Sequence, residues 1–241
     1  MREDLRFLPA GDQALVVELG DTIDPRINRR VHGLMDAIER EEVPGVFDLV
    51  PTYRSILVYY DPMRTSLSVL QARVSELYLD LEDQAVDTPR TVEIPTLYGG
   101  EYGPDLESVA KHARLTPQEV IDIHSGTDYL VYMMGFSPGF PYLGGLSERL
   151  ATPRLETPRL EIPAGSVGIA ESQTGVYPVA SPGGWRLIGR SPVRMFDAEA
   201  EPPSRLAAGD YVRFVPIASE AEYLKLQESA GRGVRAGYAA Q

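Results

Sequence analysis

The sequence predicts two domains, a small α+β domain at the N-terminus and an all-β barrel or sandwich after it. Two patterns favour this division. Residues 6–81 alternate between strand-like runs and apolar residues at helical spacing, whereas residues 129–215 carry short apolar runs separated by Gly, Pro and Ser. The 22 glycines and 20 prolines among 241 residues supply the many turns that a β-rich region requires.

Apolar spacing defines the N-terminal elements. QALVVELG (13–20) is a β-branched strand-like run, and residues 46–60 contain two more such runs. Amphipathic helices are expected within residues 21–45 and over about 67–81, because apolar residues recur there every three or four positions. Few short strands covered by two helices predict a ferredoxin-like domain over residues 1–87.

The composition changes after this domain. Acidic residues and Gly-Pro clusters dominate residues 82–107, so we place a domain junction near residue 88 and expect the acidic run to be a solvated surface or a partner surface. Two short helices should follow, one from Asp105 to about Ala113 and one in TPQEVIDIHSG (116–126). The second of them begins with a capping box.

The β-rich domain is expected to cover residues 88–218. Runs such as SVGIA (166–170) and YVRFVP (211–216) lie between turn residues, which is typical of a barrel or sandwich. No helix is expected from residue 129 to 215. Residues 219–241 should form a short helix and a mobile end.

One segment of this domain, residues 152–161, repeats the pentapeptide TPRLE. Proline before each arginine removes a ladder donor and fixes φ, so we expect a loop or edge segment within the barrel. In a straight strand, an offset of five would send Arg154 and Arg159 to opposite faces. Only a bend between them would bring the two guanidinium groups together.

Charge and composition exclude several classes of function. A net charge of −12 argues against a nucleic-acid partner, and the absence of Cys excludes thiolate chemistry. Neither a signal peptide nor an apolar run of about 20 residues is present, so we expect a cytoplasmic protein without a membrane partner. The three histidines are dispersed, and no metal site is predicted. Residues 149–194 nevertheless carry six arginines against three acids, which makes them locally positive.

No P-loop, Rossmann, HExxH or GxSxG motif is present. Two other stretches could form a ligand site, GFSPGFPYLGG (135–145) and SPGGW (181–185). Glycine lets the backbone approach a ligand, and aromatic side chains such as Trp185 could wall a small pocket. Each stretch alone is more typical of a tight barrel turn with an aromatic plug.

Several stretches together resemble the allophanate hydrolase subunit 1 family, whose members include the B-type subunit of bacterial 5-oxoprolinase and the kinase inhibitor KipI. They are GFSPGFPYLGGL, the TPR…TPR…IPAGSVGIA run, QTGVYP and SPGGWRLIGRSP. PGVFDLVPTYRSILVYYDP and YGGEYGPDL extend the resemblance over nearly the whole chain. The resemblance implies a ferredoxin-like domain joined to a cyclophilin-like β-barrel, without implying prolyl isomerase activity.

The resemblance also implies a function. A B-type subunit would act with an A-type subunit and a barrel-containing C-type subunit, and the complex would open 5-oxoproline to glutamate with ATP as co-substrate. No nucleotide motif is present in this chain, so the ATP site is left open between this chain and a partner, and the isolated chain is expected to be inactive. Two alternatives stay open: a KipI-like inhibitor of a sensor histidine kinase, and subunit 1 of an allophanate hydrolase or urea carboxylase-type carboxyltransferase.

A small anionic substrate would be stabilised by arginines and oriented backbone amides. The predicted catalytic residues are His124, Arg159 and Arg190. The predicted substrate-binding residues are Arg154, Gln173, Ser181, Gly183, Gly184 and Trp185. The arginines would hold the anion, the glycines would offer backbone amides, and the polar side chains would orient the substrate.

Overall fold

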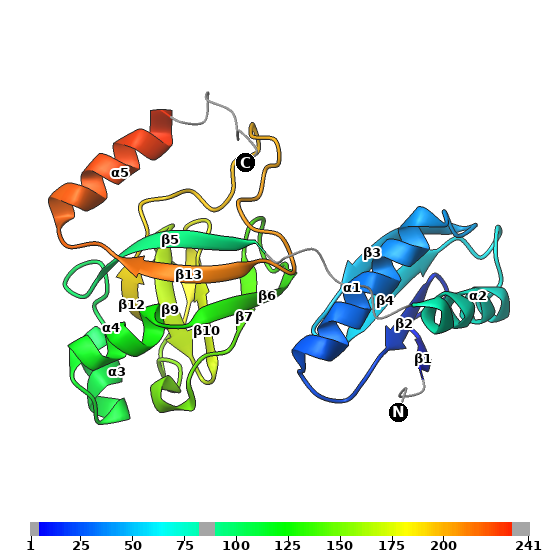
Figure 1. Cartoon of the computed structure of the whole chain (residues 1–241), viewed down its shortest axis with the longest axis horizontal. Helices are drawn as coiled ribbons and strands as arrows, with labels where there is room; N and C mark the ends of the chain where they lie inside the picture. The colour runs from blue at the N-terminus through cyan, green and yellow to red at the C-terminus, as the bar shows by residue number, and fades with distance from the viewer. Residues whose placement is uncertain (1–4, 82–89, 233–241) are drawn as a thin grey trace. The chain divides into compact units, whose positions relative to one another are not determined.

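The computed structural model describes residues 5–81 and 90–232, and internal contacts divide the chain into two units, residues 1–88 and 89–241 (Figure 1). The junction predicted near residue 88 and the mobile end predicted after the last helix lie outside the described residues. Each unit has a hydrophobic core of its own.

The N-terminal unit contains one antiparallel sheet with the strand order β1-β2-β4-β3. Its elements are β1 (Arg6–Pro9), β2 (Ala14–Glu18), α1 (Pro25–Arg40), β3 (Val46–Pro51), β4 (Ser55–Tyr60) and α2 (Leu67–Asp80). Leu15 and Val17 of β2 and Ile56 and Val58 of β4 share one core with both helices. The alternation of apolar residues in these strands therefore explains which face of the sheet the helices cover.

The predicted helices and the strands β2, β3 and β4 are confirmed, and β1 was not predicted. Its RFLP run has only four residues and shows no clear alternation. With β1 included, the element order is β-β-α-β-β-α, whereas a ferredoxin-like domain has the order β-α-β-β-α-β. The ferredoxin-like assignment therefore stays a prediction.

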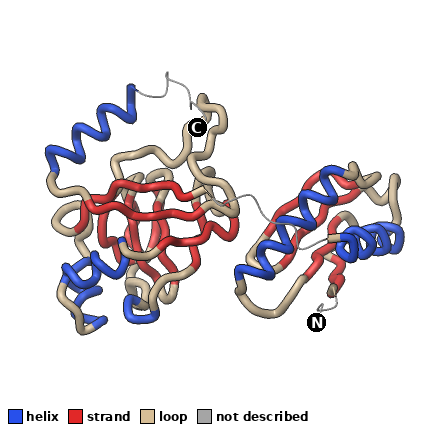
Figure 2. The backbone as a smooth tube through the Cα atoms, in the orientation of Figure 1, coloured by secondary structure: helices blue, strands red, loops and turns tan. Residues whose placement is uncertain are grey.

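The predicted barrel is confirmed: in the described residues of the second unit, seven strands form a closed barrel in the order β10-β7-β6-β13-β5-β12-β9. The strands are β5 (Thr91–Tyr98), β6 (Asp128–Met134), β7 (Pro141–Gly144), β9 (Ser166–Ala170), β10 (Gln173–Val176), β12 (Arg186–Arg190) and β13 (Tyr211–Pro216). Figure 2 shows these strands in red. Closure leaves none of them as an open edge.

Strand β5 corrects the sequence analysis, which assigns its residues to an acidic junction. It pairs in parallel with β13 and antiparallel with β12, so both of its sides are paired within the barrel. Ile94 and Thr96 point into the barrel and are fully buried. Glu93 and Pro95 alternate with them on the outer face and hide the apolar pattern, since neither residue is typical of a central strand.

The described residues of this unit also form α3 (Leu106–Ala113), α4 (Pro117–Ser125), the short 3₁₀ helix η1 (Glu148–Leu150) and α5 (Glu220–Arg232). The turn of helix at η1 was not expected, because no helix was predicted between residues 129 and 215. Figure 1 shows α3 and α4 beside the barrel, while α5 follows the end of β13. The predicted capping box is confirmed, because the Thr116 hydroxyl accepts from Glu119 N and the Glu119 carboxylate accepts from Thr116 N. The predicted C-terminal helix is also confirmed.

The repeated pentapeptide lies outside the closed barrel, so its predicted placement within the barrel is wrong. Residues 153–158 form a loop, and the second arginine of the repeat begins β8 (Arg159–Ile162). This strand pairs only with β11 (Ser181–Gly183), and together they form a two-stranded antiparallel ribbon. The expectation of a loop or edge segment is confirmed, because the prolines prevent longer pairing.

A buried histidine joins α4 to the barrel interior. His124 Nε2 lies 2.8 Å from Thr174 Oγ1, and its Nδ1 lies 2.8 Å from the Tyr98 hydroxyl. Because the Thr174 hydroxyl donates to the Gly168 carbonyl, its oxygen accepts from Nε2–H, and Nδ1 accepts from Tyr98. Burial lowers the pKa of His124 to about 3, so the ring stays neutral at ordinary pH.

We expect His124 to make stability depend on pH. In the unfolded chain this histidine takes up a proton near pH 6.5, but in the folded protein it does so only near pH 3, so acid favours unfolding between these values. The loss of stability from this one group should reach about 2 kcal/mol at about pH 5. Urea denaturation at about pH 7.5 and about pH 5 measures it.

The matched variants are His124→Gln and His112→Gln, the latter on the exposed part of α3. The first should weaken the pH dependence and the second should keep it. An equal pH dependence in wild type and His124→Gln would contradict this assignment.

Candidate functional site

Most of the predicted site residues lie on or beside the β8–β11 ribbon. They are Arg154, Arg159, Ser181, Gly183, Gly184 and Trp185. Ser181 pairs with Ile162 and Gly183 pairs with Arg159 across the ribbon. Leu155 N donates to the Gly184 carbonyl at 2.7 Å, so the loop that carries Arg154 is fixed to the same glycine segment.

Arg159 is held in place by a buried carboxylate. Its Nη2 lies 2.9 Å from Asp105 Oδ1, and its Nη1 lies 3.4 Å from the Trp185 carbonyl oxygen. The other oxygen of Asp105 accepts a hydrogen bond of 2.7 Å from Leu187 N on β12. Arg159 is therefore a fixed guanidinium that joins the ribbon to the barrel.

Arg154 differs from Arg159 in its exposure and its contacts. It is exposed, and within the described residues it has no hydrogen bond or ion pair. Its charge nevertheless acts on Tyr177. Burial raises the pKa of that hydroxyl to about 12, and the nearby guanidinium of Arg154 opposes the rise. The ribbon therefore presents one fixed arginine and one free arginine.

Aromatic side chains pack beneath the ribbon in a small core of their own. Phe140 and Tyr177 are buried, and each meets the half-buried Trp185 edge to face at a ring separation of 6.1 Å. A Cβ at Gly183 would lie 2.7 Å from the Tyr177 hydroxyl oxygen, so a larger residue here would have to displace that side chain. The buried aromatic residues thus act mainly as a plug, while Trp185 is partly exposed and its carbonyl faces Arg159.

The loop before β7 contains a strained aromatic residue, Phe136, which lies in the candidate ligand stretch at residues 135–145. Phe136 has φ 65°, and Ser137 N donates to the Gly135 carbonyl at 2.7 Å, which closes the rarer, strained form of γ-turn. The side chain is 70% exposed and its ring lies 5.4 Å from that of Phe140. Strain at an exposed aromatic residue is typical of functional surfaces. The signal in the sequence is an aromatic residue between closely spaced Gly and Pro.

Three predicted residues lie apart from this group. His124 is enclosed in the core with both ring nitrogens occupied, which favours a structural role. Arg190 ends β12, where its guanidinium lies 5.3 Å from the centre of the Tyr102 ring. Gln173 begins β10 and pairs with Ala170 in the β9–β10 hairpin.

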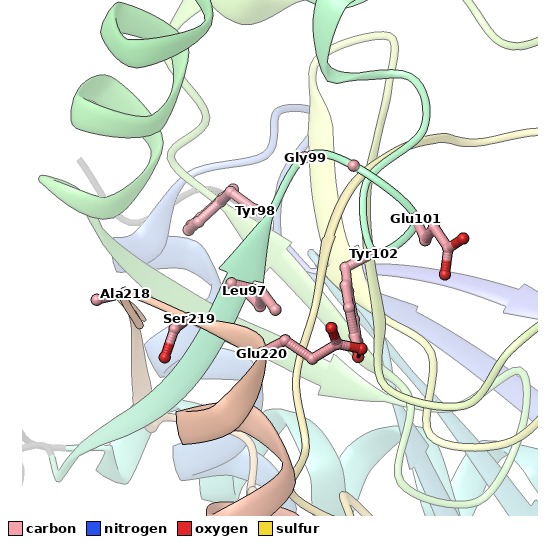
Figure 3. Close-up of a pocket in the computed structure, with 9 residues that line it drawn as sticks. Leu97, Tyr98, Gly99, Glu101, Tyr102, Ala218, Ser219 and Glu220 are labelled. Atoms are coloured by element: carbon pink, nitrogen blue, oxygen red, sulfur yellow. Dashed lines mark hydrogen bonds between the residues drawn. The ribbon is translucent and has the colours of Figure 1, made fainter.

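A hollow of about 350 Å³ lies where the end of β5 meets the start of α5 (Figure 3). Residues 97–102 and 218–220 line it. The Tyr102 hydroxyl donates to Glu220 at 2.9 Å, and this hydrogen bond raises the pKa of Tyr102. The charged residues in its described lining are Glu101 and Glu220, and the Arg190 guanidinium lies beside them against the Tyr102 ring.

The described part of the chain contains neither a cluster of metal-binding side chains nor a helix that could span a membrane. Residues 5–81 and 90–232 contain no group of three or more His, Asp or Glu side chains that could hold a metal ion. None of the helices in these ranges combines the length and the apolar character that crossing a membrane requires.

The chain is similar to known proteins over most of its length. The family model described as carboxyltransferase domain, subdomain C and D, matches residues 5–206. The B-type subunit of 5-oxoprolinase from Bacillus subtilis (strain 168) is 45% identical over 234 residues, which cover 91% of this chain and 95% of that protein.

Solved structures of two other proteins are also similar to this chain. The conserved uncharacterized protein PH0987 from Pyrococcus horikoshii is 50% identical, with a TM-score of 0.54, over 90% of this chain and 100% of that one. TTHA0988 matches with a TM-score of 0.76 and 37% identity over 86% of this chain, which spans 40% of TTHA0988. This chain therefore belongs to the family of carboxyltransferase domains, subdomain C and D.

Proposed function

We propose that this chain is the B-type subunit of an ATP-dependent 5-oxoprolinase complex, which opens 5-oxoproline to glutamate together with A- and C-type subunits. The observation that carries the proposal is the 45% identity to the B-type subunit of the Bacillus subtilis 5-oxoprolinase over 95% of that protein. The isolated chain is then inactive, and its two units are a ferredoxin-like domain and a cyclophilin-like barrel.

The ribbon provides the chemistry that such a substrate needs. 5-Oxoproline carries a carboxylate beside a cyclic amide, and a guanidinium group binds a carboxylate through two parallel hydrogen bonds. Each hydrogen bond to a charged group contributes about 1.5–3 kcal/mol. Arg154 is exposed and has free donors for this contact.

The other ribbon residues orient the substrate in this proposal. Ser181 offers a hydroxyl, Gly183 and Gly184 offer the backbone, and Trp185 offers an apolar wall. Arg159, which Asp105 holds in place, offers a second guanidinium for the substrate carboxylate and can bind it without having to reorganise. Gln173 stays a proposed contact from the neighbouring hairpin. His124 and Arg190 are left out, because one is enclosed in the core and the other lies beside the hollow at α5.

Reconstitution tests the function. Mixed with the A- and C-type subunits of its own organism, the chain should give glutamate from 5-oxoproline in the presence of ATP, and omission of any one subunit should abolish the reaction. The Bacillus subtilis system serves as the positive control. A complete mixture that forms no glutamate, while the control does, would contradict the proposal, and inhibition of a cognate sensor kinase would favour the alternative regulator.

Arg154→Ala tests the binding residue. The KM for 5-oxoproline should rise about tenfold or more, because one charge-assisted contact is lost. The melting temperature should change by no more than about 2 °C, since Arg154 is exposed and has no hydrogen bond within the described residues. Arg213→Ala is the matched control, because Arg213 is an exposed arginine paired with Asp128 on another part of the barrel. A KM that stays at the wild-type value would remove Arg154 from the site.

A further inference from the structure

The buried carboxylate of Asp105 is turned toward the ribbon and away from its own helix. Asp105 immediately precedes α3, where a carboxylate normally caps the first turn, yet its side chain makes no capping hydrogen bond. One oxygen accepts from Leu187 N and the other accepts from Arg159 Nη2 at 2.9 Å. The side chain is only 10% exposed.

Arg159 is held in place, but not all of its N–H donors make hydrogen bonds within the described residues. A guanidinium group has five N–H donors, and the described residues engage one donor strongly, through Asp105, and one weakly, through the Trp185 carbonyl. The Arg159 side chain is 30% exposed, so part of the group is open to solvent. Asp105 thus removes the conformational freedom of the arginine but leaves donors for a ligand.

We propose that Asp105 is a positioning residue for Arg159, and that it presents the remaining guanidinium donors at the ribbon surface to the carboxylate of the substrate. This inference rests on the proposed function, because it gives Arg159 a role in binding 5-oxoproline. A fixed guanidinium binds without the ordering cost that a free side chain such as Arg154 incurs. The two copies of the repeat therefore supply one preorganised arginine and one adaptable arginine.

The test is a comparison of Asp105→Asn, Arg159→Lys and the double variant in the assembled complex. Asparagine keeps an acceptor for Leu187 N but removes the charge that holds the guanidinium. We expect each single variant to raise the KM for 5-oxoproline about tenfold while kcat stays within about twofold. The double variant should be no worse than Arg159→Lys alone, because both changes remove the same interaction.

Asp128→Asn is the matched control, since it breaks the exposed Asp128–Arg213 pair and should leave the KM unchanged. A purely structural role for Asp105 predicts a lower melting temperature with an unchanged KM, and that result would overturn the proposal. Independent, additive effects of the two single variants would overturn it as well.

A second measurement separates this inference from the proposed function. Nitrogen-15 NMR of the full chain reports how fast the Arg159 guanidinium rotates, and it needs neither substrate nor partner. Rotation should be slow in wild type, fast in Asp105→Asn and unchanged in Asp128→Asn. Fast rotation in wild type would overturn the positioning role, even if the complex consumes 5-oxoproline. An inactive wild-type complex with slow rotation would contradict only the proposed function.

Discussion

The ribbon and its site depend on the hydrogen bonds and the ion pair that the Asp105 carboxylate makes. This carboxylate joins three parts of the chain that are distant in sequence: the start of α3, the backbone of β12 at Leu187 and the first residue of β8. Burying this carboxylate without a charged partner would cost several kcal/mol of folding free energy. Pairing with Arg159 avoids that cost, so the guanidinium stays beside Asp105. This pair and the packing of Ile162 against Leu187 and Tyr177 together hold the ribbon against the barrel.

The ribbon in turn gives the barrel a surface that closure alone would not provide. A closed barrel satisfies its own backbone, whereas the β8–β11 ribbon adds an outer layer in which a packed aromatic core supports charged groups. The ends of the Tyr177 and Ile162 side chains occupy the space that a side chain at position 183 would fill, so a residue larger than glycine there would have to displace them. The result is a supported surface that carries two guanidinium groups on an acidic protein, which suits a small anion and a companion subunit that would enclose it.

Local patterns predicted most of the fold. The helix caps, the strand-like runs and the loop character of the repeated pentapeptide depend on neighbouring residues, so they could be predicted from the sequence. Strand β5 could not be, because Glu93 and Pro95 on its outer face mask the inward alternation of Ile94 and Thr96. The clustering of residues 154–185 was expected, but the Asp105–Arg159 pair was not, since it joins positions 54 residues apart. The burial of His124 is likewise a tertiary effect that a helix pattern does not reveal.

The central claim is that the ribbon, completed by a partner, holds the anionic end of the substrate. A crystal structure of the assembled complex with 5-oxoproline bound tests it most directly. The account predicts the substrate carboxylate within hydrogen-bond distance of the Arg154 or Arg159 guanidinium, with Trp185 alongside. Substrate bound in the hollow between β5 and α5, or on a partner with both arginines facing solvent, would contradict it.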